Sequence, residues 1–179
     1  MKRMIAKPQL GFAEAVKLAS KRLFEFNGRS RRSEFWWFML AFTIAIYIIN
    51  SILQMLLPLL IAEIINLLMW GIALAVTVRR LQDTGHSKWW VIISWIATAI
   101  YDISVANSGI IDELSSVNAD PTVILQVFKN PVIMASMIVY MLTGIVTLVF
   151  CILDGTPEAN TYGASPKYVV TEEGDETES

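Results

Sequence analysis

Residues 35–78 read FWWFMLAFTIAIYIINSILQMLLPLLIAEIINLLMWGIALAVTV, and this stretch decides the fold. Its one charged residue is Glu63, and Pro58 divides it into apolar runs at residues 35–57 and 59–78. A helix needs about 20 mostly apolar residues to cross a bilayer core that is roughly 30 Å thick. Each run is long enough, so the stretch predicts two membrane-spanning helices joined by a tight turn.

Two more apolar runs follow along the chain. Residues 132–153 contain no charge, whereas residues 89–106 include Asp102 before a full bilayer has been crossed. A re-entrant or interfacial helix is therefore the alternative for the third run. Because 55% of all residues are hydrophobic, lipid rather than a large aqueous core is the expected solvent. The sequence thus predicts an all-α, polytopic membrane protein, built as a four-transmembrane-helix bundle.

Lysine and arginine are concentrated in alternate connections. Nine precede the first apolar run and three lie between the second and third runs, whereas the turn at Pro58 has none and residues 103–131 have only Lys129. Basic residues favour the cytoplasmic side of a membrane, so this pattern predicts four spans with both termini in the cytoplasm. Aromatic rings at the ends of the first and third spans support this orientation, because they favour the headgroup zone: Trp36, Trp37, Trp89 and Trp90.

The segment before the first span has the pattern of an amphipathic helix that stops at Asn27 and Gly28. Its apolar residues share one helical face: Phe12, Val16, Ala19, Leu23 and Phe26. We expect an interfacial helix whose basic face meets anionic headgroups. The alternative is that this helix packs against the cytoplasmic ends of the bundle.

The remaining segments are short. In the outer connection, Asp120 followed by Pro121 predicts the start of a short helix that ends at Asn130. Residues 169–179 are rich in Asp and Glu and are expected to form an acidic, disordered tail. Residues 1–168 are expected to form a single membrane domain.

The sequence offers few groups for catalysis or metal binding. Cys151 is the only cysteine and His86, expected in an exposed loop, is the only histidine, so a zinc site lacks ligands. The tripeptide Asp83-Thr84-Gly85 matches aspartic proteases, but that chemistry needs two facing aspartates and the tripeptide occurs once. The simpler interpretation is a tight turn in which the aspartate caps a helix or pairs with a neighbouring arginine. We therefore expect no enzyme, no metal and no cofactor.

Two carboxylates within the predicted spans mark a candidate ion or proton site. With a helical rise of about 1.5 Å per residue, Glu63 lies roughly 6 Å below the outer end of its span and Asp102 roughly 20 Å from Trp89. By the same helical rise, Asn50 and Ser136 lie at a similar depth in the bilayer. One interpretation is therefore a polar cluster that holds a cation or a proton. The other is that both carboxylates reach the outer headgroups or stay protonated.

Three polar motifs are predicted to share one face of the protein. They are residues 27–37 (NGRSRRSEFWW), 79–90 (RRLQDTGHSKWW) and 155–166 (GTPEANTYGASP). Glycines permit tight turns at helix ends, and we assign structural roles in the motifs to Asn27, Gly28, Asp83, Gly85, Asn160, Tyr162 and Gly163.

Together, over roughly residues 10–168, the motifs resemble the uncharacterised bacterial inner-membrane family called domain of unknown function 805. The chain differs from the usual family pattern in having Gln82 in place of His and Lys88 in place of Gly. The resemblance implies a plasma-membrane location and a helical bundle, and it carries no established activity.

The leading expectation is a non-enzymatic protein of the bacterial inner membrane whose basic cytoplasmic face contacts anionic lipid or a protein partner. The tryptophans above and five arginines would make this contact: Arg29, Arg31, Arg32, Arg79 and Arg80. The same arginines can instead pair with Glu34 and Asp83. The alternative function is a small transporter or channel that uses Glu63 and Asp102. Expected partners are membrane lipid, a protein and further copies of the chain, whereas a net charge of -2 argues against nucleic acid.

Overall fold

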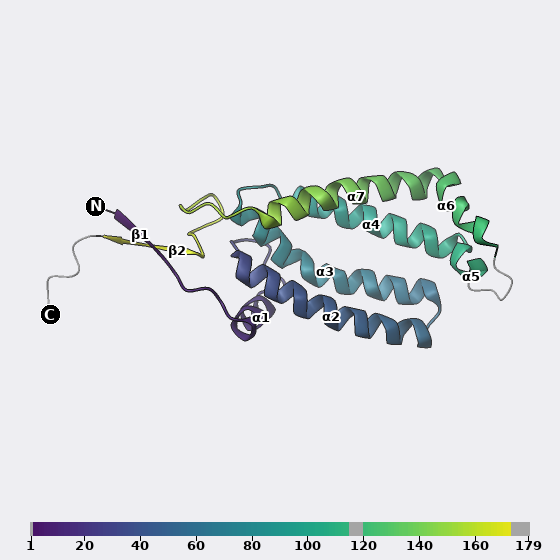
Figure 1. Cartoon of the computed structure of the whole chain (residues 1–179), viewed down its shortest axis with the longest axis horizontal. Helices are drawn as coiled ribbons and strands as arrows, with labels where there is room; N and C mark the ends of the chain where they lie inside the picture. Colours follow the sequence, from purple (N-terminus) through teal and green to yellow (C-terminus); the bar gives the residue numbers. More distant parts are fainter. Residues whose placement is uncertain (1, 115–119, 173–179) are drawn as a thin grey trace. The chain divides into compact units, whose positions relative to one another are not determined.

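The computed structural model describes residues 2–114 and 120–172. Four of its helices are long and apolar enough to cross a membrane. They are α2 (Arg32–Leu56), α3 (Leu59–Asp83), α4 (Trp89–Asn107) and α7 (Pro131–Ile152), and Figure 1 labels each of them. Each contains one of the predicted apolar runs, except that α2 and α7 end one residue before their runs do, and the third is a continuous helix through Asp102. The all-α fold class and the four spans are therefore confirmed.

The surfaces of these helices are suited to hydrocarbon. Ile44, Leu68 and Leu142 expose 55%, 64% and 61% of their area, although each lies in the middle of a long helix. Small side chains such as Ala62 and Ala97 are buried instead. A helix in lipid satisfies its own backbone hydrogen bonds, and small residues let neighbouring helices approach closely. The chain is thus a multi-pass membrane protein by the length and composition of its helices.

The chain divides into two compact units. The first comprises residues 1–41, 75–87 and 149–179, and the second comprises residues 42–74 and 88–148. Besides parts of the long helices, the first contains strand β1 (Lys2–Ala6), α1 (Phe12–Lys21) and strand β2 (Tyr168–Glu172). The second contains the short helices α5 (Ile110–Leu114), η1 (Pro121–Ile124) and α6 (Leu125–Lys129). The single domain over residues 1–168 stays a prediction.

Strands β1 and β2 in the first unit correct the prediction for the C-terminal segment. They pair antiparallel, with Ala6 opposite Tyr168 and Ile5 opposite Val169, and Figure 1 shows them side by side. The expectation of disorder is wrong for residues 169–172, because β-branched residues here suit an extended ladder although acidic residues follow. Residues 173–179 lie outside the described residues.

Helix α1 is shorter than predicted, because it ends at Lys21 and not at Asn27 and Gly28. Its end is fixed by Arg79, whose Nη1 donates to the Arg22 carbonyl at 2.5 Å. Leu23 and Phe26 therefore lie beyond the helix. The rings of Phe12 and Trp37 meet edge to face at a centroid distance of 5.7 Å, so α1 packs against the start of α2. This contact fits the alternative that we gave for the segment.

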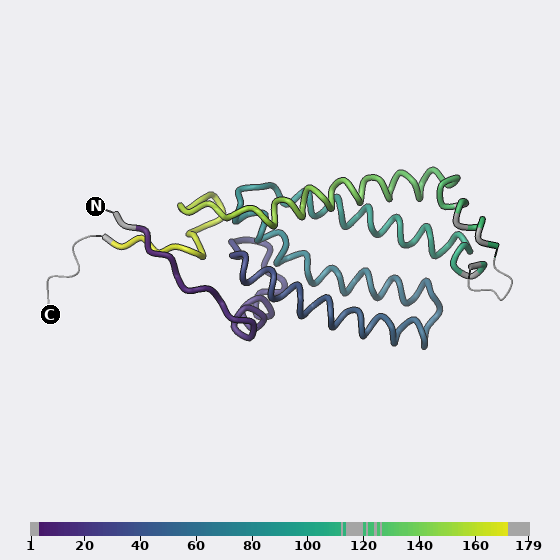
Figure 2. The backbone as a smooth tube through the Cα atoms, in the orientation of Figure 1, coloured from purple at the N-terminus to yellow at the C-terminus, as the bar shows by residue number. Residues whose placement is uncertain are grey.

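The second unit holds the tight turn at Pro58, where the chain passes directly from α2 into α3 (Figure 2). Its short helices enclose a small apolar cluster of Ile110, Val123 and Ile133. Asp120 caps η1, since its Oδ1 accepts a hydrogen bond from the Thr122 amide at 2.8 Å. The helix start predicted at Asp120 and Pro121 is therefore confirmed.

Candidate functional site: a buried charge network and an adjoining pocket

The three polar motifs meet within the first unit. Residues 27–37, 79–87 and 155–166 all belong to it, whereas Lys88, Trp89 and Trp90 belong to the second unit. The contacts between these segments are made mainly by charged side chains, which are buried at the ends of apolar helices. We call this set the buried charge network: Arg29, Ser30, Glu34, Arg79, Arg80 and Asp83.

Asp83 lies at the centre of the network. Its Oδ1 accepts a hydrogen bond from Arg29 Nε at 2.8 Å, and its Oδ2 accepts one from Arg80 Nη1 at 2.6 Å. The predicted turn and the pairing of Asp83 with a neighbouring arginine are both present. The pairing with Arg29 is the alternative that we gave for these arginines, and it joins residues that lie 54 positions apart in the sequence.

Arg29 also holds the third motif in place. Its Nη1 donates to the carbonyls of Glu158, at 2.7 Å, and Gly163, at 3.3 Å, and its Nη2 donates to the Thr156 carbonyl. The loop thus wraps around the guanidinium, whose planar fork of donors suits several carbonyl oxygens at once.

Asn160 connects the same loop to α3. Its Nδ2 donates to the Gln82 carbonyl at 2.9 Å, and its Oδ1 accepts from the Tyr162 amide at 2.9 Å. Asn160 and Gly163 exchange backbone hydrogen bonds across the loop. These hydrogen bonds fix the shape of the loop and attach it to the end of α3.

Glu34 forms the second centre of the network. Its Oε1 accepts a hydrogen bond from Ser30 Oγ at 2.9 Å and lies 3.6 Å from Arg79 Nη2. Arg79 Nε donates to the same Ser30 hydroxyl at 3.1 Å. The carboxylate, the hydroxyl and the guanidinium thereby join the start of α2 to the end of α3.

Arg79 and Arg80 also satisfy carbonyls at the ends of two other helices. Arg79 Nη1 donates to Arg22 and Glu25, just beyond α1, at 2.5 and 2.6 Å. Arg80 donates from Nε to the Cys151 carbonyl at 3.1 Å, and from Nη2 to the Leu153 carbonyl at the end of α7. The last carbonyls of a helix have no partner within it, and a cation there also opposes the helix dipole.

The end of α3 is closed by a glycine turn. Gly85 has a φ of 78°, the left-handed region that glycine adopts without strain. The His86 amide donates to Leu81 and the Gly85 amide donates to Gln82, which is the hydrogen-bond pattern of a Schellman motif. His86 is half-buried and not exposed as expected, because its ring stacks on Phe150 at a centroid distance of 3.6 Å.

The burial of the arginines corrects their expected role in surface contact. Arg29 and Arg31 expose 5% and 8% of their area, and Arg79 and Arg80 expose none. Buried guanidinium groups cannot reach a headgroup, so the alternative pairing with Glu34 and Asp83 holds for Arg29, Arg79 and Arg80. A buried charge is tolerated only with such partners. Arg32 is the one member of the set that stays exposed.

A polar pocket of about 340 Å³ lies beside the network, and we call it the Arg32 pocket. Trp36 and Trp37 line it, and each exposes 40% of its area. Asp154 and Lys167, from the C-terminal segment, could not be predicted as part of this pocket, because only the fold brings them beside α2. The full lining is Gln9, Arg31, Arg32, Ser33, Trp36, Trp37, Asp83, Asp154 and Lys167.

An exposed ion pair borders the Arg32 pocket. Lys167 Nζ lies 2.7 Å from Asp154 Oδ2. The hydrogen bond from Lys167 lowers the pKa of the Asp154 carboxyl, and the charges of Lys167, Arg32 and Arg80 lower it further. The basic side chains at this end of the pocket therefore favour the ionised form of Asp154.

The candidate carboxylates lie together in the second unit. Asp102 is close enough to Glu63 for the two groups to interact electrostatically. Glu63 also accepts hydrogen bonds from Gln54 Nε2 at 3.3 Å and from Asn66 Nδ2 at 3.5 Å. In the described part of the chain, Asn50 Oδ1 is buried without a hydrogen-bond partner. Glu63, Asp102 and Asn50 are thus polar groups embedded in an apolar unit.

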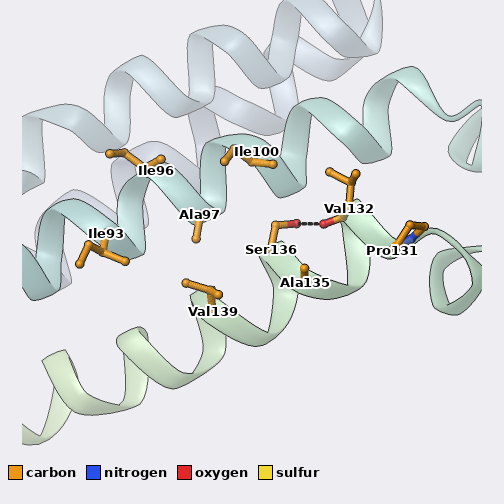
Figure 3. A pocket seen from close by; sticks show the side chains of 9 residues that line it. All are labelled: Ile93, Ile96, Ala97, Ile100, Pro131, Val132, Ala135, Ser136 and Val139. Atoms are coloured by element: carbon orange, nitrogen blue, oxygen red, sulfur yellow. Dashed lines mark hydrogen bonds between the residues drawn. The ribbon is translucent and has the colours of Figure 1, made fainter.

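Ser136 does not join these carboxylates. Its hydroxyl donates to the Val132 carbonyl of its own helix at 2.8 Å, as Figure 3 shows. The side chain faces an apolar pocket of about 510 Å³ between α4 and α7. In this pocket Ile93, Ile96 and Ile100 lie opposite Val132 and Val139. A serine that bonds to the preceding turn is a common arrangement within a helix and needs no ligand.

Comparison with known proteins places the chain in a family. Residues 23–164 match the family model described as "Protein of unknown function (DUF805)". No curated protein and no solved structure matched the chain. The matched residues include the motifs at 27–37 and 79–90 and most of the motif at 155–166. Because the match covers well over half of the sequence, the chain belongs to the DUF805 family.

Proposed function

We propose that this chain is a non-enzymatic, multi-pass protein of the bacterial inner membrane whose basic cytoplasmic face binds anionic phospholipid. One observation carries the proposal. Arg32 is exposed at the first residue of α2 and makes no hydrogen bond or ion pair within the described part of the chain. It lies one helical turn from the half-exposed Trp36, so a free cation and an aromatic ring share one face of the helix.

Helix α1 and the chain that follows it support the same proposal. Lys17 and Lys21 are exposed on α1, and Phe24 exposes 82% of its area just beyond it. Basic side chains are attracted to an anionic leaflet, while an exposed aromatic ring gains by entering the boundary between headgroups and acyl chains. The concentration of lysine and arginine before the first span supports a cytoplasmic location for this face and for both termini.

The roles of the buried groups support a non-enzymatic function. Glu34 and Asp83 accept hydrogen bonds from neighbouring side chains, and the arginines around them donate to backbone carbonyls. A general acid or base needs a proton position that a substrate can reach. These carboxylates are instead engaged in holding the helix ends together.

The proposal is tested by lipid-selective quenching of tryptophan fluorescence. The purified chain is reconstituted in vesicles of phosphatidylglycerol and phosphatidylcholine, with bromine on the acyl chains of one lipid at a time. We expect brominated phosphatidylglycerol to quench more strongly, and the preference to weaken as salt screens the charges. Equal quenching by the two lipids would overturn the proposal and favour a protein partner for this face.

Matched variants locate the contact. Replacing Lys17, Lys21 and Arg32 together with glutamine should remove most of the preference, at about 1 kcal/mol for each basic residue near an anionic surface. Lys129→Gln is the control, because this exposed cation lies in the connection that we place on the outer side. An equal loss in the control would mean that total charge, and not this face, sets the preference.

A second candidate function is a small transporter or channel, and it is supported by the proximity of Asp102 and Glu63. Ionisable groups within a membrane are expensive to bury and often mark an ion path. Its test is cation and proton flux into vesicles that contain the purified chain. Flux that disappears in the Asp102→Asn and Glu63→Gln variants would favour this function, and absence of flux in the parent chain would exclude it.

A further inference from the structure

The Arg32 pocket combines groups from three separate parts of the first unit. Gln9 comes from the segment before α1, Arg32 and Trp36 come from the start of α2, and Lys167 comes from the segment before β2. Its volume of about 340 Å³ is within the range of roughly 300–1,000 Å³ that is usual for small-ligand pockets. The fold therefore forms a pocket large enough for a small ligand at the start of helix α2, and not merely a charged surface.

The carboxylates in this pocket are already engaged. Both oxygens of Asp83 accept hydrogen bonds, from Arg29 and from Arg80. Asp154 accepts a hydrogen bond from Lys167. Among the described residues, neither acid forms an ion pair with Arg32.

Unused hydrogen-bond donors also line the pocket. Arg32 makes no hydrogen bond or ion pair among the described residues, and the buried Arg31 makes one hydrogen bond, from Nη1 to the Pro8 carbonyl at 2.6 Å. Ser33 Oγ is buried and has no partner within the described part of the chain. A guanidinium carries five N–H donors, so the donors of the exposed Arg32 remain available to an acceptor.

We propose that the Arg32 pocket binds one phosphate group, supplied by the headgroup of an anionic phospholipid. This inference rests on the proposed function and goes further, because it replaces a general attraction to a charged surface with a discrete site. Phosphate fits the donors, since guanidinium groups bind it through paired, charge-assisted hydrogen bonds. Trp36 and Trp37 supply the amphipathic wall that the glycerol and acyl portions of a lipid require.

The ion pair between Asp154 and Lys167 sets the affinity of the site. The side chains of Lys167 and Asp154 expose 34% and 55% of their area, and exposed pairs of this kind contribute little to stability. Lys167 is therefore able to turn from Asp154 to a phosphate oxygen. Removing the Asp154 charge should strengthen phosphate binding, because the carboxylate competes for the ammonium group and repels the ligand.

The test uses the full chain in phosphatidylcholine nanodiscs, titrated with short-chain phosphatidylglycerol. We expect saturation at one lipid for each chain. Arg32→Gln and Lys167→Gln should each weaken binding about tenfold, the value of one charge-assisted hydrogen bond. Asp154→Asn should tighten binding severalfold, and Lys129→Gln, an exposed cation outside the pocket, should change it by less than about twofold.

Soluble probes distinguish the source of the phosphate. The same nanodiscs are titrated with glycerol 3-phosphate and with inorganic phosphate in competition with the lipid. Competition only at concentrations far above that of the lipid supports a lipid headgroup as the ligand. Binding of the soluble probes as tightly as the lipid would overturn the lipid assignment.

Two negative results have different meanings. If folded Arg32→Gln and Lys167→Gln bind phosphatidylglycerol as the parent chain does, the discrete site is overturned. A preference for brominated phosphatidylglycerol that persists in these variants would then leave the proposed function standing. If the parent chain shows no preference for anionic lipid, the proposed function fails together with the site. Circular dichroism and the elution volume of each variant show whether it has folded.

Discussion

A guanidinium buried at a helix end needs partners for its charge and for its N–H groups. In this chain Asp83 supplies the negative charge that balances Arg29 and Arg80. Backbone carbonyls accept hydrogen bonds from most of the remaining N–H groups. Hydrogen bonds to charged groups contribute about 1.5–3 kcal/mol each, which helps to offset the loss of water around the ions. Each of these arginines therefore donates to several backbone carbonyls, and these hydrogen bonds hold the loops against the helix ends.

Removing the charge of Asp83 should destabilise the first unit strongly. In Asp83→Asn, Arg29 and Arg80 stay buried without their shared counter-charge, and we expect a loss of about 3–5 kcal/mol. The free energy of unfolding in mixed detergent micelles measures this loss. Asp154→Asn is the matched control, because it breaks an exposed ion pair and should lose less than about 1 kcal/mol. Similar losses in both variants would contradict the assignment of Asp83 as the centre of the network.

The ion pair of Asp154 and Lys167 predicts a small dependence of stability on pH. The hydrogen bond from Lys167 lowers the pKa of Asp154, so the pair stabilises the fold above the ordinary carboxyl pKa of 3.8. This contribution is lost as the pH falls through the lowered pKa of the folded state. The pKa of Lys167 is raised mainly by the hydrogen bond to Asp154, so at the alkaline end the contribution is lost only above 10.5.

The difference in stability between the parent chain and Lys167→Gln measures this effect. We expect about 0.5 kcal/mol at neutral pH, a value reduced by solvent exposure and by added salt. The difference should disappear as the pH falls through the lowered pKa of Asp154. A difference that stays constant down to low pH would show that Lys167 stabilises the fold by packing alone.

At the scale of elements, the loop at residues 155–166 is fitted closely to the end of α3. A Cβ added to Gly155 would overlap the Asp83 carboxylate. Gly155→Ala should therefore displace the loop or the carboxylate and destabilise the protein by about 1–3 kcal/mol. Gly144→Ala is the control, because its new Cβ would meet only Ser94 Oγ at 3.9 Å within a helix. That variant should be neutral or more stable by up to about 1 kcal/mol.

Thermal unfolding of the two glycine variants in one detergent provides the comparison. The loop contacts also predict faster hydrogen exchange at the Thr156 amide in Gly155→Ala, because this amide donates to the Asp83 carbonyl at 2.9 Å. Equal stability of the two variants would mean that the loop moves to accept the new methyl group without lowering the free energy of unfolding, which would contradict the close fit.

The long helices could be predicted from sequence because length and apolar composition are local properties. The run at residues 59–78 has both, and α3 covers it. The carbonyl partners of Arg29 in the loop at residues 155–166 could not be found in this way, since they are distant in the sequence and depend on the packing of helix ends. Strand β2 was missed for the same reason, because β1 pairs with it from the opposite end of the chain. Asp154 and Lys167 became part of the candidate site only through the fold.

At the scale of the whole molecule, apolar composition predicted the class of protein, whereas function depends on which side of the membrane the charged ends face. Ser87 is exposed in the connection between α3 and α4, and Ser108 is exposed just beyond α4. The distribution of lysine and arginine predicts the cytoplasm for Ser87 and the outer side for Ser108. Binding of anionic cytoplasmic lipid by the Arg32 pocket requires this orientation.

The most direct test is labelling of single cysteines in intact cells with a maleimide that cannot cross the inner membrane. Cys151 is first replaced by serine, and Ser87→Cys and Ser108→Cys are then made separately in that background. We predict that the Ser108→Cys variant is labelled in intact cells and that the Ser87→Cys variant is labelled only after the membrane is permeabilised. Labelling of the Ser87→Cys variant in intact cells would place the charged face outside and contradict the proposed function.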